Sequence, residues 1–363
     1  MTNEKDQQIL EALKKLENKE FNIYFFVLDS KGNPIGELAY IYEHAKILRD
    51  NGLNAIILTE KNDYTGVGDW LGEQYMQIPH VSVESQTLKV GPQDFLIIPE
   101  IFANVMDQTK QMPCKRIVFS QSYDYILEIL NIGTKWSDYG IRNVITTTEK
   151  QKQYINELFQ NLVVDVVPLG IPDYFKVNEK PQKPVVALSC RDPRDTTKIV
   201  KSFYLKYPQY KWITFRDMKG LPRESFATIL SECCLAVWVD QISGFGTFPI
   251  EAMKCNVPVI GRVPNIVPEW MEQPSGEGQE KTLKDNGIWT FDTVKIVDLI
   301  ATFIRLWLED NIPADVYEKT KDTIENYTME KMRNEVTNYY NRQINERIAE
   351  LSLLITKPET TNA

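Results

Sequence analysis

Short apolar runs bounded by polar residues, glycine or proline recur along the first half of the chain, and amphipathic stretches separate them. Runs of about four to eight apolar and β-branched residues predict buried strands. Apolar character that is continuous rather than alternating is typical of a parallel sheet covered on both faces. The predicted strands of this half cover residues 21–28, 54–59, 94–99, 116–120, 143–147 and 163–167.

Between the first two predicted strands, Leu38, Ile41, Ala45 and Leu48 fall on one helical stripe. This spacing predicts a helix packed on the sheet. The chain therefore begins as alternating strands and helices, the pattern of an α/β unit.

A polar segment at residues 170–184 holds three prolines and predicts a linker. After it the pattern starts again, so we expect two α/β units of similar size. The predicted strands of the second unit cover residues 185–190, 211–215, 235–239, 257–260 and 287–291. Its predicted helices cover about 196–207, 223–233, 249–254 and 294–308. Apolar residues at helical spacing from residue 328 onward predict a long final helix.

Composition and charge narrow the classes of function. The chain has 41 basic and 50 acidic residues, a net charge of −9, so no dense basic surface for nucleic acid is expected. It contains no apolar stretch long enough to cross a membrane, and its polar N-terminus does not resemble a secretory signal. Five cysteines without metal or disulfide spacing favour a cytoplasmic protein, and we expect the Cys233–Cys234 pair at a buried helix end.

The segment after the predicted strand 235–239 contains the strongest candidate ligand-binding residues of the chain. Gly244 and Gly246 permit close approach of the backbone to a ligand, and Pro249 suits the first turn of a helix. The N-terminus of that helix would offer N–H groups to a phosphate. Glu251, one turn further, could accept hydrogen bonds from sugar or ribose hydroxyls.

This segment resembles the donor-binding segment of family 4 of the retaining glycosyltransferases. The resemblance is carried by Gly-Phe-Gly at 244–246, Pro-x-Glu-Ala-Met at 249–253 and Pro-Val-Ile at 258–260. Supporting segments are Val-Pro-Leu-Gly-Ile-Pro-Asp-Tyr-Phe at 167–175, Pro-Glu-Trp at 268–270, Asp-Asn-Gly-Ile-Trp at 285–289 and Thr-Met-Glu-Lys-Met at 328–332. The likeness is dense over residues 163–340 and weak before them.

The resemblance implies the GT-B fold: two Rossmann-like, doubly wound α/β domains of parallel sheet facing a cleft. It places an acceptor-side domain at residues 1–170, a donor domain at 171–327, and a C-terminal helix at 328–356 that crosses back to the first domain. It also implies a retaining, metal-independent transfer of a sugar from a nucleotide-sugar. No metal site and no further cofactor are expected.

The resemblance also assigns site residues. Arg191 and Lys198 would hold the donor diphosphate, with Arg194 as a rival for the second cation. Gly36 would face the phosphates from the first domain. The other expected donor-binding residues are Ser243, Gly244, Phe245, Gly246, Thr247 and Glu251.

Two positions depart from the family pattern. Ser243 stands where the pattern has a glutamate that contacts the transferred sugar, and Gln121 stands where many members have a histidine. Glutamine can donate a hydrogen bond to a sugar hydroxyl but cannot act as a base near neutral pH. We count Gln121, Arg191, Lys198 and Glu251 as the candidate catalytic residues.

The leading hypothesis is a glycosyltransferase that moves a sugar from a donor such as a UDP- or GDP-sugar to a glycan, lipid-linked or protein acceptor. The alternative is a catalytically degenerate relative that serves as a binding or scaffold subunit. A thin basic cluster at Lys110, Lys115 and Arg116 leaves open a peripheral contact with the inner membrane face.

Overall fold

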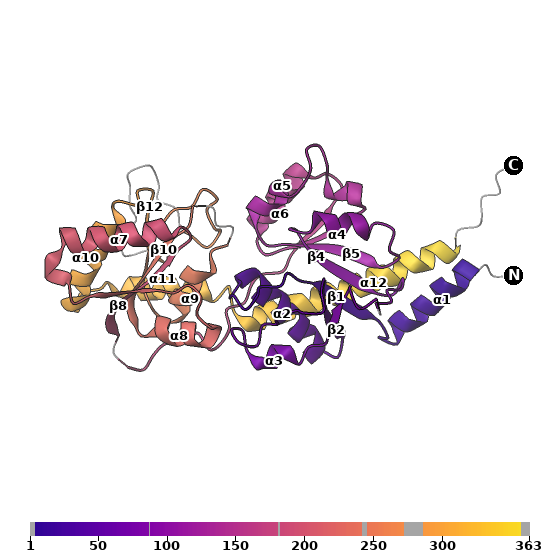
Figure 1. Cartoon of the computed structure of the whole chain (residues 1–363), viewed down its shortest axis with the longest axis horizontal. Helices are drawn as coiled ribbons and strands as arrows, with labels where there is room; N and C mark the ends of the chain where they lie inside the picture. The colour runs from indigo at the N-terminus through magenta and orange to yellow at the C-terminus, as the bar shows by residue number, and fades with distance from the viewer. Residues whose placement is uncertain (1–3, 87, 181, 242–244, 272–285, 357–363) are drawn as a thin grey trace. The chain divides into compact units, whose positions relative to one another are not determined.

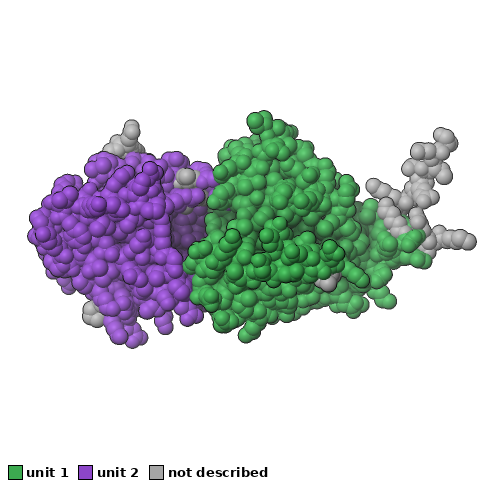
Figure 2. Space-filling model, viewed as in Figure 1, with its two compact units in different colours: residues 1–121, 125–168, 332–363 green, residues 122–124, 169–331 purple. Residues whose placement is uncertain are grey.

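The computed structural model describes residues 4–86, 88–180, 182–241, 245–271 and 286–356, and the chain forms two compact units (Figure 1, Figure 2). Unit 1, green in Figure 2, comprises Met1–Gln121, Tyr125–Pro168 and Met332–Ala363. Unit 2, purple in the same view, comprises Ser122–Asp124 and Leu169–Lys331. Each unit is built on its own parallel sheet.

Unit 1 has a seven-stranded sheet in the order β3-β2-β1-β4-β5-β6-β7, with every pair parallel. The order reverses at β1, which lies between β2 and β4, and ligands of open α/β sheets bind at the carboxyl ends of strands at such a point. The strands are β1 (Asn22–Phe26), β2 (Asn54–Thr59), β3 (His80–Ser82), β4 (Phe95–Pro99), β5 (Lys115–Ser120), β6 (Asn143–Thr146) and β7 (Val163–Val166).

Helices cover the unit 1 sheet and bury its apolar side chains. The apolar stripe on α2 is buried as predicted, with Leu38, Ile41, Ala45 and Leu48 each at most 4% exposed. The helices before the linker are α1 (Glu4–Glu17), α2 (Gly36–Asp50), α3 (Glu73–Met76), α4 (Ala103–Gln108), α5 (Tyr123–Glu128) and α6 (Glu149–Leu158).

Unit 2 has a five-stranded parallel sheet in the order β12-β11-β10-β8-β9, which reverses between β8 and β10. Both sheets therefore have the doubly wound α/β topology that the sequence predicts. The strands are β8 (Lys183–Cys190), β9 (Thr214–Asp217), β10 (Cys233–Val239), β11 (Val259–Arg262) and β12 (Ile288–Thr290). The helices are α7 (Pro193–Lys206), α8 (Arg223–Ser231), α9 (Thr247–Lys254), α10 (Ile296–Leu308) and α11 (Ala314–Ile324).

The predicted position of the two adjacent cysteines is wrong. Helix α8 ends before Glu232, and Cys233 and Cys234 begin the central strand β10 instead of ending the helix. Both side chains are at most 1% exposed, because the start of β10 pairs with β8 in the middle of the sheet. Burial raises the pKa of each of these thiols to about 12, so both stay protonated.

The last helix, α12 (Met329–Thr356), begins in unit 2 and continues in unit 1 from Met332 (Figure 1). Its Tyr340 is fully buried against Phe25 of β1, with ring centroids 6.1 Å apart. Further along, Lys115 of β5 donates hydrogen bonds to Glu346 at 3.1 Å and to Glu350 at 3.0 Å.

Replacing Lys115 with methionine is expected to lower the free energy of unfolding by about 1–2 kcal/mol. The lysine side chain is 5% exposed, whereas its two glutamate partners are 39% and 46% exposed and can regain water. Urea denaturation measures the change. Lys46→Met is the matched control, because Lys46 makes a half-exposed pair with Asp50 on one helix, expected to contribute less than about 0.5 kcal/mol. Equal losses in the two variants would show that the buried pair does not anchor α12.

Candidate functional site

A cation lies at the point of unit 2 where the strand order reverses. Arg191 directly follows β8, and its backbone N–H donates to the carbonyl of Val239 on neighbouring β10 at 2.9 Å. Its guanidinium Nη1 lies 3.7 Å from Oδ2 of Asp240, which follows β10. The Arg191 side chain remains 48% exposed. The fold therefore presents a guanidinium to solvent at the sheet edge where nucleotides bind in doubly wound folds.

A second cation beside it is absent from the sequence-based candidates. Lys219 follows β9, the other neighbour of β8, and its Nζ donates to the backbone carbonyl of Arg191 at 3.1 Å. Asp217 fixes the turn by accepting from the Lys219 backbone N–H at 3.0 Å. The signal in the sequence was a lysine just beyond a strand, and it was missed because that strand was predicted to end at residue 215.

Arg194 and Lys198 both lie on α7 but have different partners. Asp192 caps this helix by accepting from the Arg194 backbone N–H at 2.8 Å, and it also binds the Arg194 guanidinium at 2.6 Å. The hydrogen bond from the Arg194 side chain is the main cause that lowers the pKa of Asp192 to about 2. Lys198 is 3.8 Å from Asp195 and is 73% exposed. Of these two predicted cations, Lys198 is therefore paired more weakly than Arg194, which is held by its own helix cap.

The glycine-bearing loop leads into the N-terminus of α9. Ser243 and Gly244 lie outside the described residues. Gly246 is the residue before the helix and has φ of +71°, a conformation that side chains rarely adopt. Thr247 begins α9, and in the described part of the loop no side chain caps that end. Its first N–H groups thus suit an anion.

Phe245 anchors the loop to the rest of unit 2. Its side chain is 5% exposed and contacts the ring of Tyr327, with centroids 5.1 Å apart. Its carbonyl accepts from the indole N–H of Trp270 at 2.6 Å. The backbone of Phe245, rather than its ring, is therefore the part that could meet a ligand.

Glu251 is 1% exposed and forms an ion pair with Arg223, whose Nη2 lies 2.6 Å from its Oε1. Arg223 begins α8, and its guanidinium lies over two aromatic rings, 5.0 Å from the centroid of Phe175 and 5.5 Å from that of Phe226. Sequence reasoning missed Arg223, since nothing in the local pattern links it to α9. The pair fixes the orientation of the Glu251 carboxylate.

In unit 1 the structure brings Gln121 and the region of Gly36 together. Gln121 follows β5, its backbone N–H donates to Glu100 at 2.8 Å, and its side-chain amide donates to the carbonyl of Glu37 at 3.0 Å. Gly36 begins α2, and a Cβ there would meet no described atom within 4 Å. Glu100, buried at the end of β4, is a further polar residue of this edge that the sequence did not single out.

The described ranges of the chain contain neither a metal-binding cluster nor a membrane-spanning helix. Among those residues, no three histidine, cysteine, aspartate or glutamate side chains gather closely enough to hold a metal ion. No helix in them combines the length and the apolar character needed to span a bilayer.

The chain is similar in sequence to a known protein and in fold to many solved structures. No known family profile matches the chain. The alpha-1,6-glucosyltransferase of Actinobacillus pleuropneumoniae serotype 7 is 25% identical over 248 residues, which are 67% of this chain and 73% of the relative.

Two solved structures share the fold. The sucrose-phosphate synthase of Thermosynechococcus elongatus superposes with a TM-score of 0.60 at 12% identity, covering 90% of this chain and 99% of the synthase. The pneumococcal O-GlcNAc transferase GtfA, solved with UDP and GlcNAc, gives a TM-score of 0.60 at 10% identity over 90% of this chain and 99% of GtfA.

Homology to a glucosyltransferase and a fold shared with glycosyltransferases identify the chain as a GT-B glycosyltransferase. The predicted fold and enzyme class are thereby confirmed. Membership of family 4 stays a prediction.

Proposed function

We propose that this glycosyltransferase transfers a glucosyl residue from UDP-glucose to a hydroxyl group, with retention of the α configuration and without a metal ion. The relative from Actinobacillus is named for an α-1,6 glucosyl transfer, and the pneumococcal structure contains UDP. The observation that carries the proposal is the pair of cations, Arg191 and Lys219, at the reversal point of the unit 2 sheet.

In this proposal the donor diphosphate binds between these cations and the N-terminus of α9. As the bond between C1 of the glucose and the β-phosphate oxygen breaks, negative charge develops on that oxygen. Arg191, with Lys198 or Lys219, stabilises this charge, each charge-assisted hydrogen bond contributing about 1.5–3 kcal/mol. Fixed cations and the helix terminus take the place of a divalent ion.

The acceptor oxygen forms its bond to C1 on the face that the diphosphate leaves, and its proton passes to the departing β-phosphate. No side-chain base is required, which is compatible with glutamine at position 121. The Gln121 amide has two N–H bonds, and one of them is used for the carbonyl of Glu37. We assign the other to a sugar hydroxyl. Glu251, oriented by Arg223, is assigned to the ribose hydroxyls.

Thermal melting of the full chain with UDP, GDP, ADP and their glucose conjugates tests the proposal. UDP at a hundred times its dissociation constant is expected to add about 2.7 kcal/mol of stability. Arg191→Gln should remove most of that gain, whereas Arg305→Gln should keep it, because Arg305 is an exposed arginine at the far end of α10. Absence of a shift with every nucleotide would contradict the proposal and favour the scaffold alternative.

A further inference from the structure

Two adjoining cavities lie at the carboxyl edge of the unit 1 sheet. One has a volume of about 290 Å³ and the other about 450 Å³. Leu28, just after β1, and Phe102, just after β4, line both of them. Since β1 and β4 flank the point where the strand order reverses, the cavities occupy the expected ligand position of this sheet.

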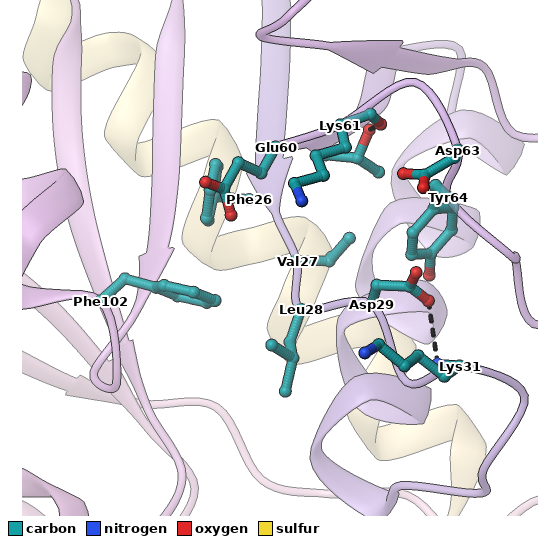
Figure 3. A pocket seen from close by; sticks show the side chains of 11 residues that line it. Phe26, Val27, Leu28, Asp29, Lys31, Glu60, Lys61, Asp63, Tyr64 and Phe102 are labelled. Carbon is teal, nitrogen blue, oxygen red and sulfur yellow. Dashed lines mark hydrogen bonds between the residues drawn. The ribbon is translucent and has the colours of Figure 1, made fainter.

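The smaller one, called here the polar cavity, has charged side chains on part of its wall, together with Phe26, Val27, Leu28 and Phe102 (Figure 3). Its lining includes three carboxylates and two ammonium groups, so its charges nearly balance. A balanced set offers both donors and acceptors, as hydroxyl groups require, whereas a phosphate site needs an excess of cations. The charged residues are Asp29, Lys31, Glu60, Lys61 and Asp63.

Polar contacts hold the walls of the polar cavity in place. Asp29 accepts from the Thr65 hydroxyl at 2.6 Å and from the Lys31 backbone N–H at 2.9 Å. The hydroxyl of Tyr64 lies 3.0 Å from that of Tyr42, and its ring stacks on His80 with centroids 5.7 Å apart. These groups are therefore oriented before a ligand arrives, which reduces the entropic cost of binding.

The larger one, called here the apolar cavity, has a mainly aliphatic lining. Leu28 and Ile129 on its wall are 47% and 36% exposed, more than core side chains of this size usually are. Its polar groups include Glu37, Glu100 and Gln121, the residues already found at the edge of the sheet. The apolar lining consists of Leu28, Ile35, Leu38, Ile41, Pro99, Ile101, Phe102 and Ile129.

We infer that the acceptor is an amphipathic glycoside, with its sugar in the polar cavity and an aliphatic aglycone in the apolar cavity. The inference rests on the proposed function in one respect, because it takes the occupant of these cavities to be the acceptor. A free oligosaccharide would leave about 450 Å³ of apolar space unfilled, and an anionic lipid headgroup would meet three carboxylates. One uncharged molecule with a polar and an apolar end suits both cavities and the wall that they share.

Calorimetric titration of the full chain with alkyl β-glucosides tests this inference, using methyl, butyl and hexyl chains below their micellar concentrations. The affinity is expected to rise about fourfold for each methylene buried. A hexyl ether of triethylene glycol, which carries the tail without the sugar, is expected to bind at least about tenfold more weakly than hexyl glucoside, since it cannot use the charged lining of the polar cavity.

A matched pair of variants distinguishes binding in the cavities from nonspecific binding of the alkyl chain to the protein surface. Leu28→Gln changes a side chain that lines both cavities, whereas Leu127→Gln changes one that lines neither. The two leucines are 47% and 51% exposed, so both variants should fold. Leu28→Gln is expected to flatten the dependence of affinity on alkyl chain length. Leu127→Gln is expected to behave as the unsubstituted protein.

The inference is overturned if the affinity for alkyl β-glucosides does not depend on the length of the alkyl chain. It is also overturned if Leu28→Gln and Leu127→Gln lose that dependence equally. If UDP stabilises the chain while chain length has no effect, the inference fails and the proposed function stands. If chain length matters and Leu28→Gln abolishes the effect, but no nucleotide binds, the cavity assignment stands and the proposed function fails.

Discussion

Replacing Glu251 with glutamine is expected to lower glucosyl transfer from UDP-glucose at least about a hundredfold. The carboxylate is assigned to the ribose hydroxyls, and the loss of two charge-assisted hydrogen bonds of about 1.5–3 kcal/mol each exceeds the energy of a hundredfold change. The substitution also removes the charge partner of Arg223, which is itself 14% exposed. We therefore expect a loss of stability of about 1–3 kcal/mol in unit 2, even though glutamine can still accept from Arg223.

The binding of UDP and of 2′-deoxy-UDP separates these two effects. The unsubstituted protein should prefer UDP by about tenfold or more, and Glu251→Gln should bind both nucleotides equally at a temperature where it is folded. Glu224→Gln, an exposed glutamate beside Arg223 on α8, serves as the control and should keep the preference. A Glu251→Gln protein that still prefers UDP would remove Glu251 from the ribose site.

Acid is expected to destabilise unit 1 through His44. This side chain is fully buried on α2 between Phe119, 4.7 Å away by ring centroids, and Tyr340 of α12, 6.3 Å away. Burial lowers the pKa of His44 from 6.5 to about 3, so the folded protein holds the neutral form. The unfolded chain binds a proton near pH 6.5. The stabilisation is complete above that pH and is lost as the pH falls toward the folded-state pKa.

The expected loss from this residue is about 2 kcal/mol between pH 7.5 and pH 5.0. Urea denaturation at the two pH values, compared between the unsubstituted protein and His44→Phe, measures it. Phenylalanine keeps the aromatic contacts but cannot bind a proton. The stability of the His44→Phe protein should therefore fall less over that pH interval than that of the unsubstituted protein. Part of the acid dependence should remain, because burial also lowers the pKa of His80, the second of the two histidines. If the free energy of unfolding falls equally with pH in the two proteins, His44 is not a source of the acid sensitivity.

Most of the secondary structure could be predicted because each strand is a compact apolar run between polar residues. The pattern failed where a strand lacks such a run. His80–Ser82 follows a proline and is only three residues long, so β3 gave no apolar signal and was missed. Cys233 and Cys234 were placed on the helix because sequence periodicity does not show where a strand begins, and pairing with β8 decides it.

The candidate site was predictable only in part, for a related reason. Arg191 could be proposed from its place after a strand. Lys219 also follows a strand, but the apolar pattern ends that strand at residue 215, two residues too early, and so hides it. Arg223 and Glu100 could not be proposed, because each gains its role from a partner on another element: the Glu251 carboxylate and the Gln121 backbone N–H. No local motif records such pairings. The ligand roles of Arg191, Lys198, Gln121 and Glu251 stay predictions until a donor is bound.

The most direct test of the account is the product formed from UDP-glucose and hexyl β-glucoside, followed by NMR together with release of UDP. The account predicts that UDP and a diglucoside form in equal amounts, that the new linkage has the α configuration, and that Arg191→Gln slows both. A β linkage would contradict retention. UDP binding without any sugar transfer, to this acceptor or to free oligosaccharides, would contradict the central claim that this site catalyses glucosyl transfer.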